Sequence, residues 1–172
     1  MSYNYSEFKQ KKRDDFNPSV PPDDNRIPSG LIKDIQLNGS EHFIHEYKNI
    51  NGQTCFYIKK KQDRGGKSFT PMSYCPEKKT WVPKAWPGER PLFHEQRLKG
   101  SEKPVLITEG EKSCMAGENK IEFTDYNIVT WSGGSNQVHQ TNFKHLKNKE
   151  VILWPDNDDQ GIKAMVEVAI TL

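Results

Sequence analysis

The chain has 172 residues, of which 33% are hydrophobic and 28% are charged, and its formal net charge is +2. No apolar run approaches 18 residues and the first 15 residues are polar, so we expect neither a transmembrane helix nor a secretory signal. This composition predicts a cytoplasmic protein without a membrane partner. The mean hydropathy of −0.89 is low for a fully packed domain, which predicts that part of the chain is disordered.

The charge is divided unevenly along the chain. Residues 31–104 carry 14 basic and 8 acidic side chains, whereas residues 105–172 carry 6 basic and 10 acidic ones. Basic surfaces attract phosphates and acidic clusters attract cations, so this order suits a protein that acts on polyphosphates with a metal. The three cysteines, Cys55, Cys75 and Cys114, form no C-x-x-C pair, so we expect reduced thiols and no zinc ribbon.

Residues 1–38 are predicted to be a disordered tail, because they combine several prolines with many polar residues. Residues 39–103 are predicted to form a small, basic, antiparallel β subdomain. Residues 43–47 and 54–58 predict two strands on either side of the turn signal Asn51-Gly52, and residues 68–74 predict a third strand interrupted by Pro71.

A basic loop with a Gly-Gly hinge is predicted to follow the second strand. Its five cationic residues indicate either an ordinary solvated hairpin tip or a contact with phosphates. Trp81 and Trp86, which lie among prolines, either fill a small core or stack on bases. The cationic residues of the predicted loop are Lys59, Lys60, Lys61, Arg64 and Lys67.

Residues 104–172 alternate between strands and helices, which predicts a parallel sheet with right-handed crossovers. The strands are expected at 105–108, 128–131 and 151–154, and the first and last are apolar throughout, as in buried parallel strands. Helices are expected at 113–119 and 160–171, and residues 136–146 predict a helix or an irregular turn.

Acidic residues follow two of these strands. Glu109 ends the first, and Asp156 and Asp158 end the third, two residues apart and therefore on one side of an extended chain. If the two strands are neighbours, the three carboxylates meet at one sheet edge and can hold Mg²⁺, or one of them can take a proton. The alternative is a solvated turn in which an aspartate caps the following helix. Gly133-Gly134 supplies a further turn at the same edge, where backbone N–H groups can face a phosphate.

These motifs resemble the TOPRIM domain shared by bacterial-type DNA primases, topoisomerases, OLD-family nucleases and recombination mediators. The resemblance is carried by residues 105–110, which end in Glu-Gly, and by residues 151–161, which contain D-x-D followed by glycine. The spellings E-G-E-K, S-G-G and W-P-D-N-D-x-x-G, with R-P-L-F upstream, are most similar to primases and primase-helicases of phages, plasmids and prophages. Compared with that family, the chain lacks the zinc ribbon and is expected to be truncated after the last helix.

The resemblance implies a DNA primase-like protein that performs metal-dependent nucleotidyl transfer on single-stranded DNA. Mg²⁺ or Mn²⁺ would be held by Asp156 and Asp158, with Glu109 as the general base or a third ligand. The substrates would be nucleoside triphosphates, and a replicative helicase is a further expected partner. The alternatives are a metal-dependent TOPRIM nuclease and a non-catalytic nucleic-acid-binding remnant. The residues expected to contact nucleic acid or phosphate are Lys59, Lys60, Lys61, Arg64, Lys67, Lys112, Gly133 and Gly134.

Overall fold

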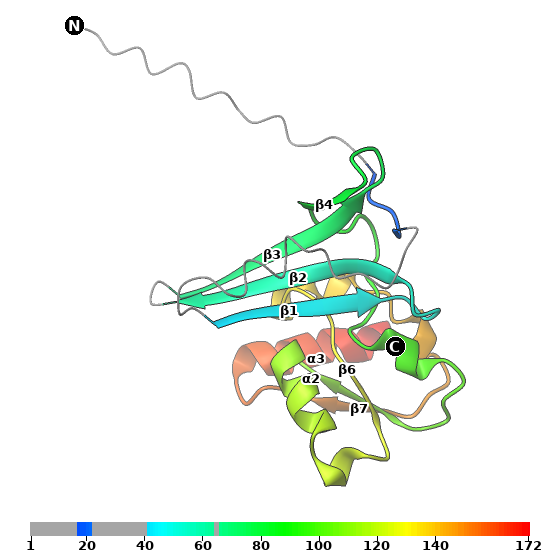
Figure 1. The fold of residues 1–172 in the computed structure, drawn as a ribbon. Helices are drawn as coiled ribbons and strands as arrows, with labels where there is room; N and C mark the ends of the chain where they lie inside the picture. Colours follow the sequence, from blue (N-terminus) through cyan, green and yellow to red (C-terminus); the bar gives the residue numbers. More distant parts are fainter. Residues whose placement is uncertain (1–16, 22–40, 64–65) are drawn as a thin grey trace, which may run out of the picture.

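The computed structural model describes residues 17–21, 41–63 and 66–172, and within these ranges it contains two sheets (Figure 1). The first is antiparallel, in the order β1-β2-β3-β4, and the second is parallel, in the order β6-β5-β7. The mixed α/β class, with an antiparallel sheet followed by a parallel one, is confirmed. The strands are β1 (Glu41–Lys48), β2 (Thr54–Asp63), β3 (Gly66–Cys75), β4 (Thr80–Pro83), β5 (Val105–Thr108), β6 (Asn127–Val129) and β7 (Val151–Trp154).

Two α-helices and four short 3₁₀ helices complete the described part of the chain. α2 begins at Glu111, two residues before the predicted start, because Gly110 has extended backbone and precedes it as the N-cap residue. Residues 136–146 form two 3₁₀ segments rather than one helix. The helices are α2 (Glu111–Glu118) and α3 (Asp159–Thr171), with η1 (Glu95–Leu98), η2 (Ile121–Phe123), η3 (Ser135–Gln140) and η4 (Lys144–Leu146).

The β1–β2 hairpin turns where the sequence predicts it. Gly52 adopts a φ of 81°, which is accessible to glycine at no steric cost. The Asn49 Oδ1 atom accepts hydrogen bonds from the backbone N–H groups of Asn51 and Gln53. The turn is therefore held by its own side chain, as Asn residues commonly do.

The prediction of a basic loop after the second strand is wrong, because most of the cationic residues assigned to it lie in strands. Residues 59–61 continue β2, and Lys67 lies in β3. The third strand also runs through Pro71 without a break. On the β4 side of β3, only residues 72–75 are paired. Pro71 therefore has no partner on that side, and its lack of a backbone N–H breaks no hydrogen bond there. Arg64 and Gly65, at the tip, lie outside the described residues.

The parallel sheet is covered by α3 on one face and by α2 on the other. Val105 and Ile107 pack in a core cluster with Met165 and Val168 of α3. Leu106, between them, points the other way into a second cluster with Cys114 of α2. The central strand β5 is buried throughout, as parallel strands buried on both faces are. β7 departs from this expectation, because it lies at the edge and Trp154 is 55% exposed.

The second core cluster also joins the two sheets. Tyr47 and Phe56, from β1 and β2, stack with ring centroids 4.4 Å apart, and Tyr47 also contacts Phe93. The Tyr47 hydroxyl donates a 2.6 Å hydrogen bond to Glu111 at the start of α2. Because this cluster is shared, the antiparallel sheet is fixed over the α2 face of the parallel sheet, above it in Figure 1.

The two tryptophans of the proline-rich segment take part in packing. Trp81 contacts the rings of Tyr57 and Tyr74, and Trp86 packs beside Phe56. These contacts favour the core interpretation over base stacking. All three cysteines are free and buried, as expected for reduced thiols.

The predicted tail at 1–38 falls outside the described residues except for 17–21. In this short piece, the Ser19 N–H donates to the Tyr74 carbonyl, and Val20 packs against the second core cluster. Within the described part of the chain, no helix is both long enough and apolar enough to cross a membrane.

Candidate metal and nucleic-acid site

The pairing of β5 with β7 brings the predicted carboxylates to one end of the parallel sheet. Thr108 and Trp154, the last residues of the two strands, are register partners. Glu109 therefore leaves β5 beside the point where Asp156 leaves β7. The condition on which the predicted site depends, that these two strands are neighbours, is met.

One oxygen of the Glu109 carboxylate has no hydrogen-bond partner from the described residues. This oxygen, Oε2, is buried. Burial raises the pKa of Glu109, and the negative charges of Asp156 and Asp158 raise it further, while the Asp156 backbone N–H opposes this shift. A cation at this edge would remove the repulsion and supply the missing partner.

Asp158 has a structural role as well as a predicted chemical one. Its Oδ1 atom accepts a 2.8 Å hydrogen bond from the Gly161 N–H, so it is the N-cap of α3. The capping alternative is therefore correct for Asp158. Its second carboxylate oxygen has no hydrogen bond that the structure records, and both Asp156 and Asp158 are exposed to solvent.

Gly161 leaves the space that Glu109 occupies. A Cβ atom at this position would lie 2.5 Å from Glu109 Oε2, 2.7 Å from the Asp156 carbonyl oxygen and 2.9 Å from the Asp156 nitrogen. Only glycine lets α3 begin so close to the carboxylates. The sequence identifies Gly161 as the glycine that follows D-x-D, but only the structure shows which groups it accommodates.

The carboxylates fit a hard cation that keeps part of its water shell. In the described structure, the carboxylate oxygens of Glu109, Asp156 and Asp158 do not all lie within 4.8 Å of one another. Mg²⁺ commonly binds through one or two carboxylates and fills its other positions with water and substrate phosphates. The unpartnered Glu109 oxygen and the exposed Asp156 carboxylate match that requirement.

The Ser-Gly-Gly segment lies at the end of β6. It is held in part by Arg90, to which the sequence analysis gave no role. Gly133 and Gly134 have φ values of 93° and 74°. The Trp131 Nε1–H donates to the Gly134 carbonyl oxygen, and Arg90 donates to the Ser132 hydroxyl oxygen. Burial lowers the pKa of Arg90. The signal for Arg90 was its place in the R-P-L-F motif, which carries no indication of its partner.

Strand alternation divides the basic residues between the two faces of the antiparallel sheet. Lys60 is opposite Phe43 on β1 and opposite Phe69 on β3. Phe43 is two positions from His45 and four from Tyr47, so this row lies on the face that packs against α2. Lys67 shares the face with Phe69, whereas residues 59 and 61 point to the opposite side.

Two exposed aromatic rings flank the lysine in this row. Phe43 is 41% exposed and Phe69 is 55% exposed, and the Lys60 ammonium lies 5.6 Å from the centre of the Phe69 ring. Exposed rings beside cations are typical of surfaces that stack bases and hold the phosphate backbone of single strands. We call the row of Phe43, Lys60 and Phe69 the aromatic–lysine row.

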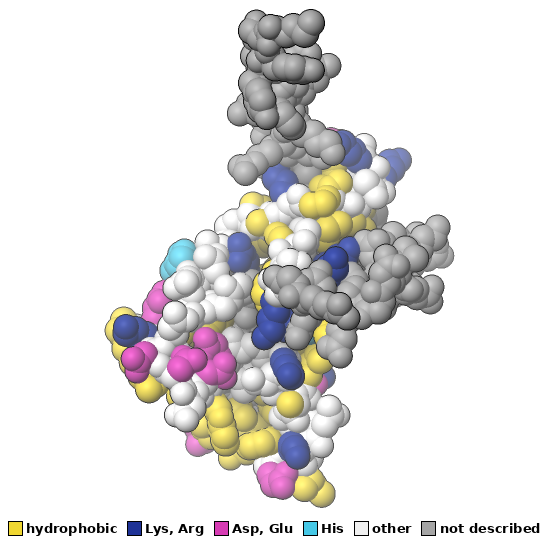
Figure 2. All heavy atoms as spheres, turned by 90° about the vertical axis from the view of Figure 1, so that its left-hand side faces the viewer, with side chains coloured by type: hydrophobic (Ala, Val, Ile, Leu, Met, Phe, Trp, Pro, Cys, Tyr) yellow, Lys and Arg dark blue, Asp and Glu magenta, His cyan; other side chains and the backbone are white. Residues whose placement is uncertain are grey.

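Basic and acidic side chains share one face of the molecule. The tip of β2 and β3 and the start of α3 lie on the left-hand side of Figure 1. Figure 2 views that side and shows a group of Asp and Glu side chains with a column of Lys and Arg side chains next to it.

Lys112, another residue predicted to contact phosphate, is exposed in the first turn of α2.

A hollow of about 310 Å³ adjoins the carboxylate site. Thr108 and Asp156 line it, together with the side chains of Phe123 and Trp154. Its apolar wall lies directly beside the predicted metal ligands.

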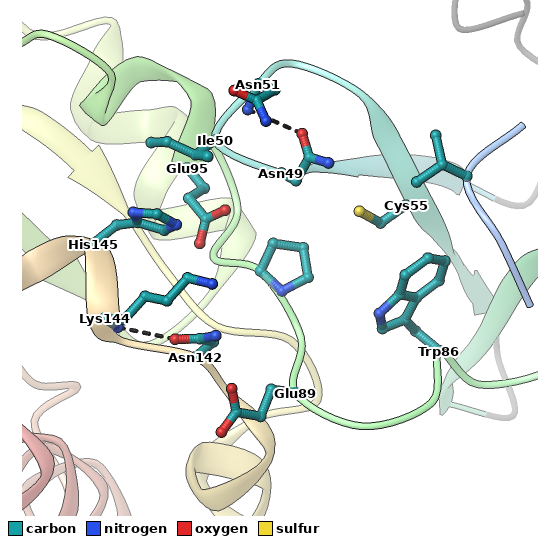
Figure 3. A pocket seen from close by; sticks show the side chains of 12 residues that line it. Asn49, Ile50, Asn51, Cys55, Trp86, Glu89, Glu95, Asn142, Lys144 and His145 are labelled. Carbon is teal, nitrogen blue, oxygen red and sulfur yellow. Dashed lines mark hydrogen bonds between the residues drawn. The ribbon is translucent and has the colours of Figure 1, made fainter. Parts of the chain in front are cut away.

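A second hollow lies away from the predicted site residues, none of which line it. It has about the same volume, and Figure 3 shows the side chains of Glu95, Lys144 and Trp86 around it. Glu95 is 3% exposed, and burial raises its pKa to about 7, although N–H groups of Leu92 and Ile50 and the charge of Lys144 oppose the shift. This site contains a titratable group but no convergent ligands for a metal.

Comparison with known proteins connects the carboxylate site to a family. Residues 106–172 match the family model described as Toprim-like. The C-terminal part of this chain is a Toprim-like domain. No curated protein sequence matches the chain.

Two solved bacteriophage T7 structures share the fold. One contains T7 lagging-strand DNA polymerase with primase domains of two gp4 subunits, bound to an RNA/DNA hybrid and dTTP. The match has 20% identity and a TM-score of 0.58, and covers 90% of this chain and 75% of that one. The other is the primase fragment of the T7 primase-helicase, with 22% identity and a TM-score of 0.57, covering 80% of this chain and 51% of that one. Because both matches extend beyond the Toprim-like domain, the antiparallel sheet belongs to the shared architecture.

Replacing Gly161 by alanine should destabilise the protein by about 1–3 kcal/mol, because the added methyl group meets backbone atoms that cannot turn away. Gly110→Ala is the matched control, since a Cβ atom there meets nothing within 4 Å, and its cost should stay within about 1 kcal/mol. Urea unfolding of both variants provides the measurement. Equal losses in the two variants would contradict the close approach at Gly161.

The stability that Glu95 contributes below pH 4.5 should be lost as the pH rises to about 7, because its pKa is raised in the folded protein and it loses its proton more easily when unfolded. The contribution is about 3 kcal/mol from the size of the shift. Glu95→Gln should remove this loss, so that its stability relative to the unaltered protein increases between pH 4.5 and 7, whereas Glu102→Gln, at an exposed position, should show no such change. Denaturant unfolding across this pH range tests the difference, and unchanged profiles in both variants would refute it.

Proposed function

We propose that this protein is a primase-like nucleotidyltransferase that synthesises short oligonucleotides on single-stranded DNA. The observation that carries the proposal is the position of Glu109, whose buried, unpartnered oxygen lies beside Asp156 at the carboxyl end of a Toprim-like sheet. The fold shared with T7 primase structures supports the same reaction class. A role in replicating a phage, plasmid or prophage follows from this proposal, with action in the cytoplasm.

The acidic residues would divide the work at the reaction centre. Asp156 would be the principal ligand of Mg²⁺ or Mn²⁺, and the uncapped oxygen of Asp158 would assist it. The bound cation would neutralise charge on the triphosphate and lower the pKa of an attacking hydroxyl group. Glu109, with its raised pKa, would accept the hydroxyl proton, or would act as a third ligand.

The antiparallel sheet would hold the template. Lys60 and Lys67 would contact phosphates from the face that packs toward α2, while the rings of Phe43 and Phe69 would stack on bases. Arg64, at the tip of the same hairpin, lies outside the described residues and remains a predicted phosphate contact. Lys112 and the backbone of Gly133 and Gly134 are proposed to meet the triphosphate at the sheet edge. A replicative helicase remains a proposed partner.

A binding protein without turnover is the second candidate. It is favoured by the spacing of the carboxylates, which do not gather within 4.8 Å, and by the engagement of Asp158 as a helix cap. Such a protein would bind DNA through the antiparallel sheet with no response to metal. A metal-dependent nuclease is the third candidate, because the same acidic residues can activate water for phosphodiester hydrolysis.

Incubating the protein with labelled single-stranded DNA, nucleoside triphosphates and Mg²⁺ or Mn²⁺ should yield new short oligonucleotides on a gel. Asp156→Asn should reduce their formation by about 100-fold or more, because it removes the proposed principal ligand. Asp159→Asn is the matched control in the same segment and should retain synthesis.

Shortened DNA in place of new oligonucleotides would favour the nuclease. DNA binding with no product under either metal would favour the binding protein.

Reversing two lysines on one face of the antiparallel sheet should weaken DNA binding. Lys60→Glu with Lys67→Glu should reduce affinity for single-stranded DNA by about tenfold or more, and should lower the salt slope of log K by about one per lost phosphate contact. Lys59→Glu with Lys61→Glu changes the net charge by the same amount on the opposite face and should have a smaller effect.

Fluorescence anisotropy across a salt series measures both quantities. Equal losses in the two double variants would indicate nonspecific attraction to the net charge and would contradict binding on the α2 face.

A further inference from the structure

A group of three potential metal ligands lies outside the carboxylate site. His94 precedes η1, and Cys114 and Glu118 lie four residues apart on α2, so that both project from one side of the helix. The ligand atoms of all three lie within 4.8 Å of one another. Glu118 ends α2, whereas Glu109 precedes its first turn, so this group is distinct from the carboxylates at the sheet edge.

The distances between ligand atoms are close to those around a single zinc ion. The Cys114 Sγ and His94 Nδ1 atoms are 3.8 Å apart, and His94 Nδ1 is 2.5 Å from Glu118 Oε1. Zinc bonds to sulfur at about 2.3 Å and to nitrogen and oxygen at about 2.0–2.2 Å, which separates ligand atoms by roughly 3.3–3.8 Å. The first distance already fits, and the second needs an opening of about 1 Å, which a rotation of the Glu118 side chain can provide.

The donor set and its burial match a borderline cation rather than Mg²⁺. Sulfur and imidazole nitrogen favour zinc, whereas Mg²⁺ prefers oxygen ligands alone. Cys114 is fully buried, and the side chains of His94 and Glu118 are 14% and 20% exposed, which leaves an entry path from their side. One thiolate, one carboxylate and a neutral imidazole balance the charge of a divalent ion, so the occupied site would bury no net charge.

The backbone at His94 is strained in a way that the ring position explains. His94 has a φ of 65° and a ψ of 21°, in the left-handed region that non-glycine residues rarely adopt. Glycine would relieve the strain, but it would lose the imidazole ring, which stacks on Phe93 at a centroid distance of 3.8 Å. The stacked ring directs Nδ1 at Glu118 and Cys114. Strain of this kind is often found at binding sites.

We propose that His94, Cys114 and Glu118 bind one Zn²⁺ ion, with water in the fourth position, and that this ion ties the start of η1 to α2. In the described structure Glu118 also contacts Arg97, which is partly exposed and can turn outward when the ion binds. Without the ion, Arg97, Glu118 and His94 form an ordinary polar contact network. The two states differ in whether the Cys114 sulfur is a thiol or a metal-bound thiolate.

Cobalt titration of the full, metal-stripped chain tests this site directly. One equivalent of Co²⁺ should produce a near-ultraviolet thiolate-to-cobalt charge-transfer band and visible bands typical of tetrahedral coordination, and Zn²⁺ should abolish them. Cys114→Ser should remove the charge-transfer band, and Glu118→Gln, which leaves the sulfur in place, should weaken cobalt binding by at least tenfold. Glu102→Gln, at an exposed position outside both metal sites, should bind cobalt as the unaltered protein does.

The far-ultraviolet circular dichroism spectrum of each variant shows whether it is folded. If Cys114→Ser does not fold, the cobalt affinity of Glu118→Gln decides whether the site exists. Absence of the charge-transfer band in the unaltered protein would overturn the proposal, as would equal cobalt affinity in Glu118→Gln. Because this readout needs neither DNA nor nucleotides, its outcome is independent of primer synthesis.

Discussion

The parallel pairing of β5 with β7 is the constraint on which the candidate site depends. Backbone hydrogen bonds between these strands place Glu109 next to Asp156, although the two residues are 47 positions apart in the sequence. Gly161 then allows α3 to start against the same carboxylates. Burial and the neighbouring negative charges raise the pKa of Glu109, and one of its oxygens is buried without a hydrogen-bond partner. A shift of the strand register by even one residue would turn these groups away from one another.

The shared aromatic core fixes the antiparallel sheet relative to α2. Tyr47, Phe56 and Phe93 pack between the sheets, and the Tyr47 hydroxyl bonds to Glu111 of α2. These contacts orient the antiparallel sheet so that the aromatic–lysine row lies on the face toward α2. A template bound there and a triphosphate bound at the carboxylates would approach each other from two structural units, which is the arrangement that templated nucleotidyl transfer requires.

The two candidate metal sites differ in chemistry as well as in place. The sheet edge presents exposed oxygens that suit a hydrated, exchangeable Mg²⁺. The group on α2 combines a buried sulfur with an imidazole, which suits a tightly held Zn²⁺. An exchangeable ion fits a reaction in which the substrate brings phosphate ligands, whereas a tightly held ion fits a structural role. The group on α2 contains a thiolate and the carboxylate site does not, so a thiolate-to-cobalt band distinguishes the two.

The amino-acid sequence by itself determined the local elements and the identity of the carboxylates. Continuous apolar runs predicted β5 and β7, and the turn signal Asn51-Gly52 between two candidate strands predicted the β1–β2 hairpin. The glutamate and aspartates that follow β5 and β7 were placed correctly at the ends of these strands. Only the tertiary structure decided which groups meet. The basic stretch lies in paired strands, so that Lys60 is on one face of the sheet and residues 59 and 61 are on the other. Packing also places His94 next to Cys114, although the two residues are 20 positions apart. Local propensity is encoded in neighbouring residues, whereas sheet face and side-chain proximity arise from pairings between distant segments that no short pattern specifies.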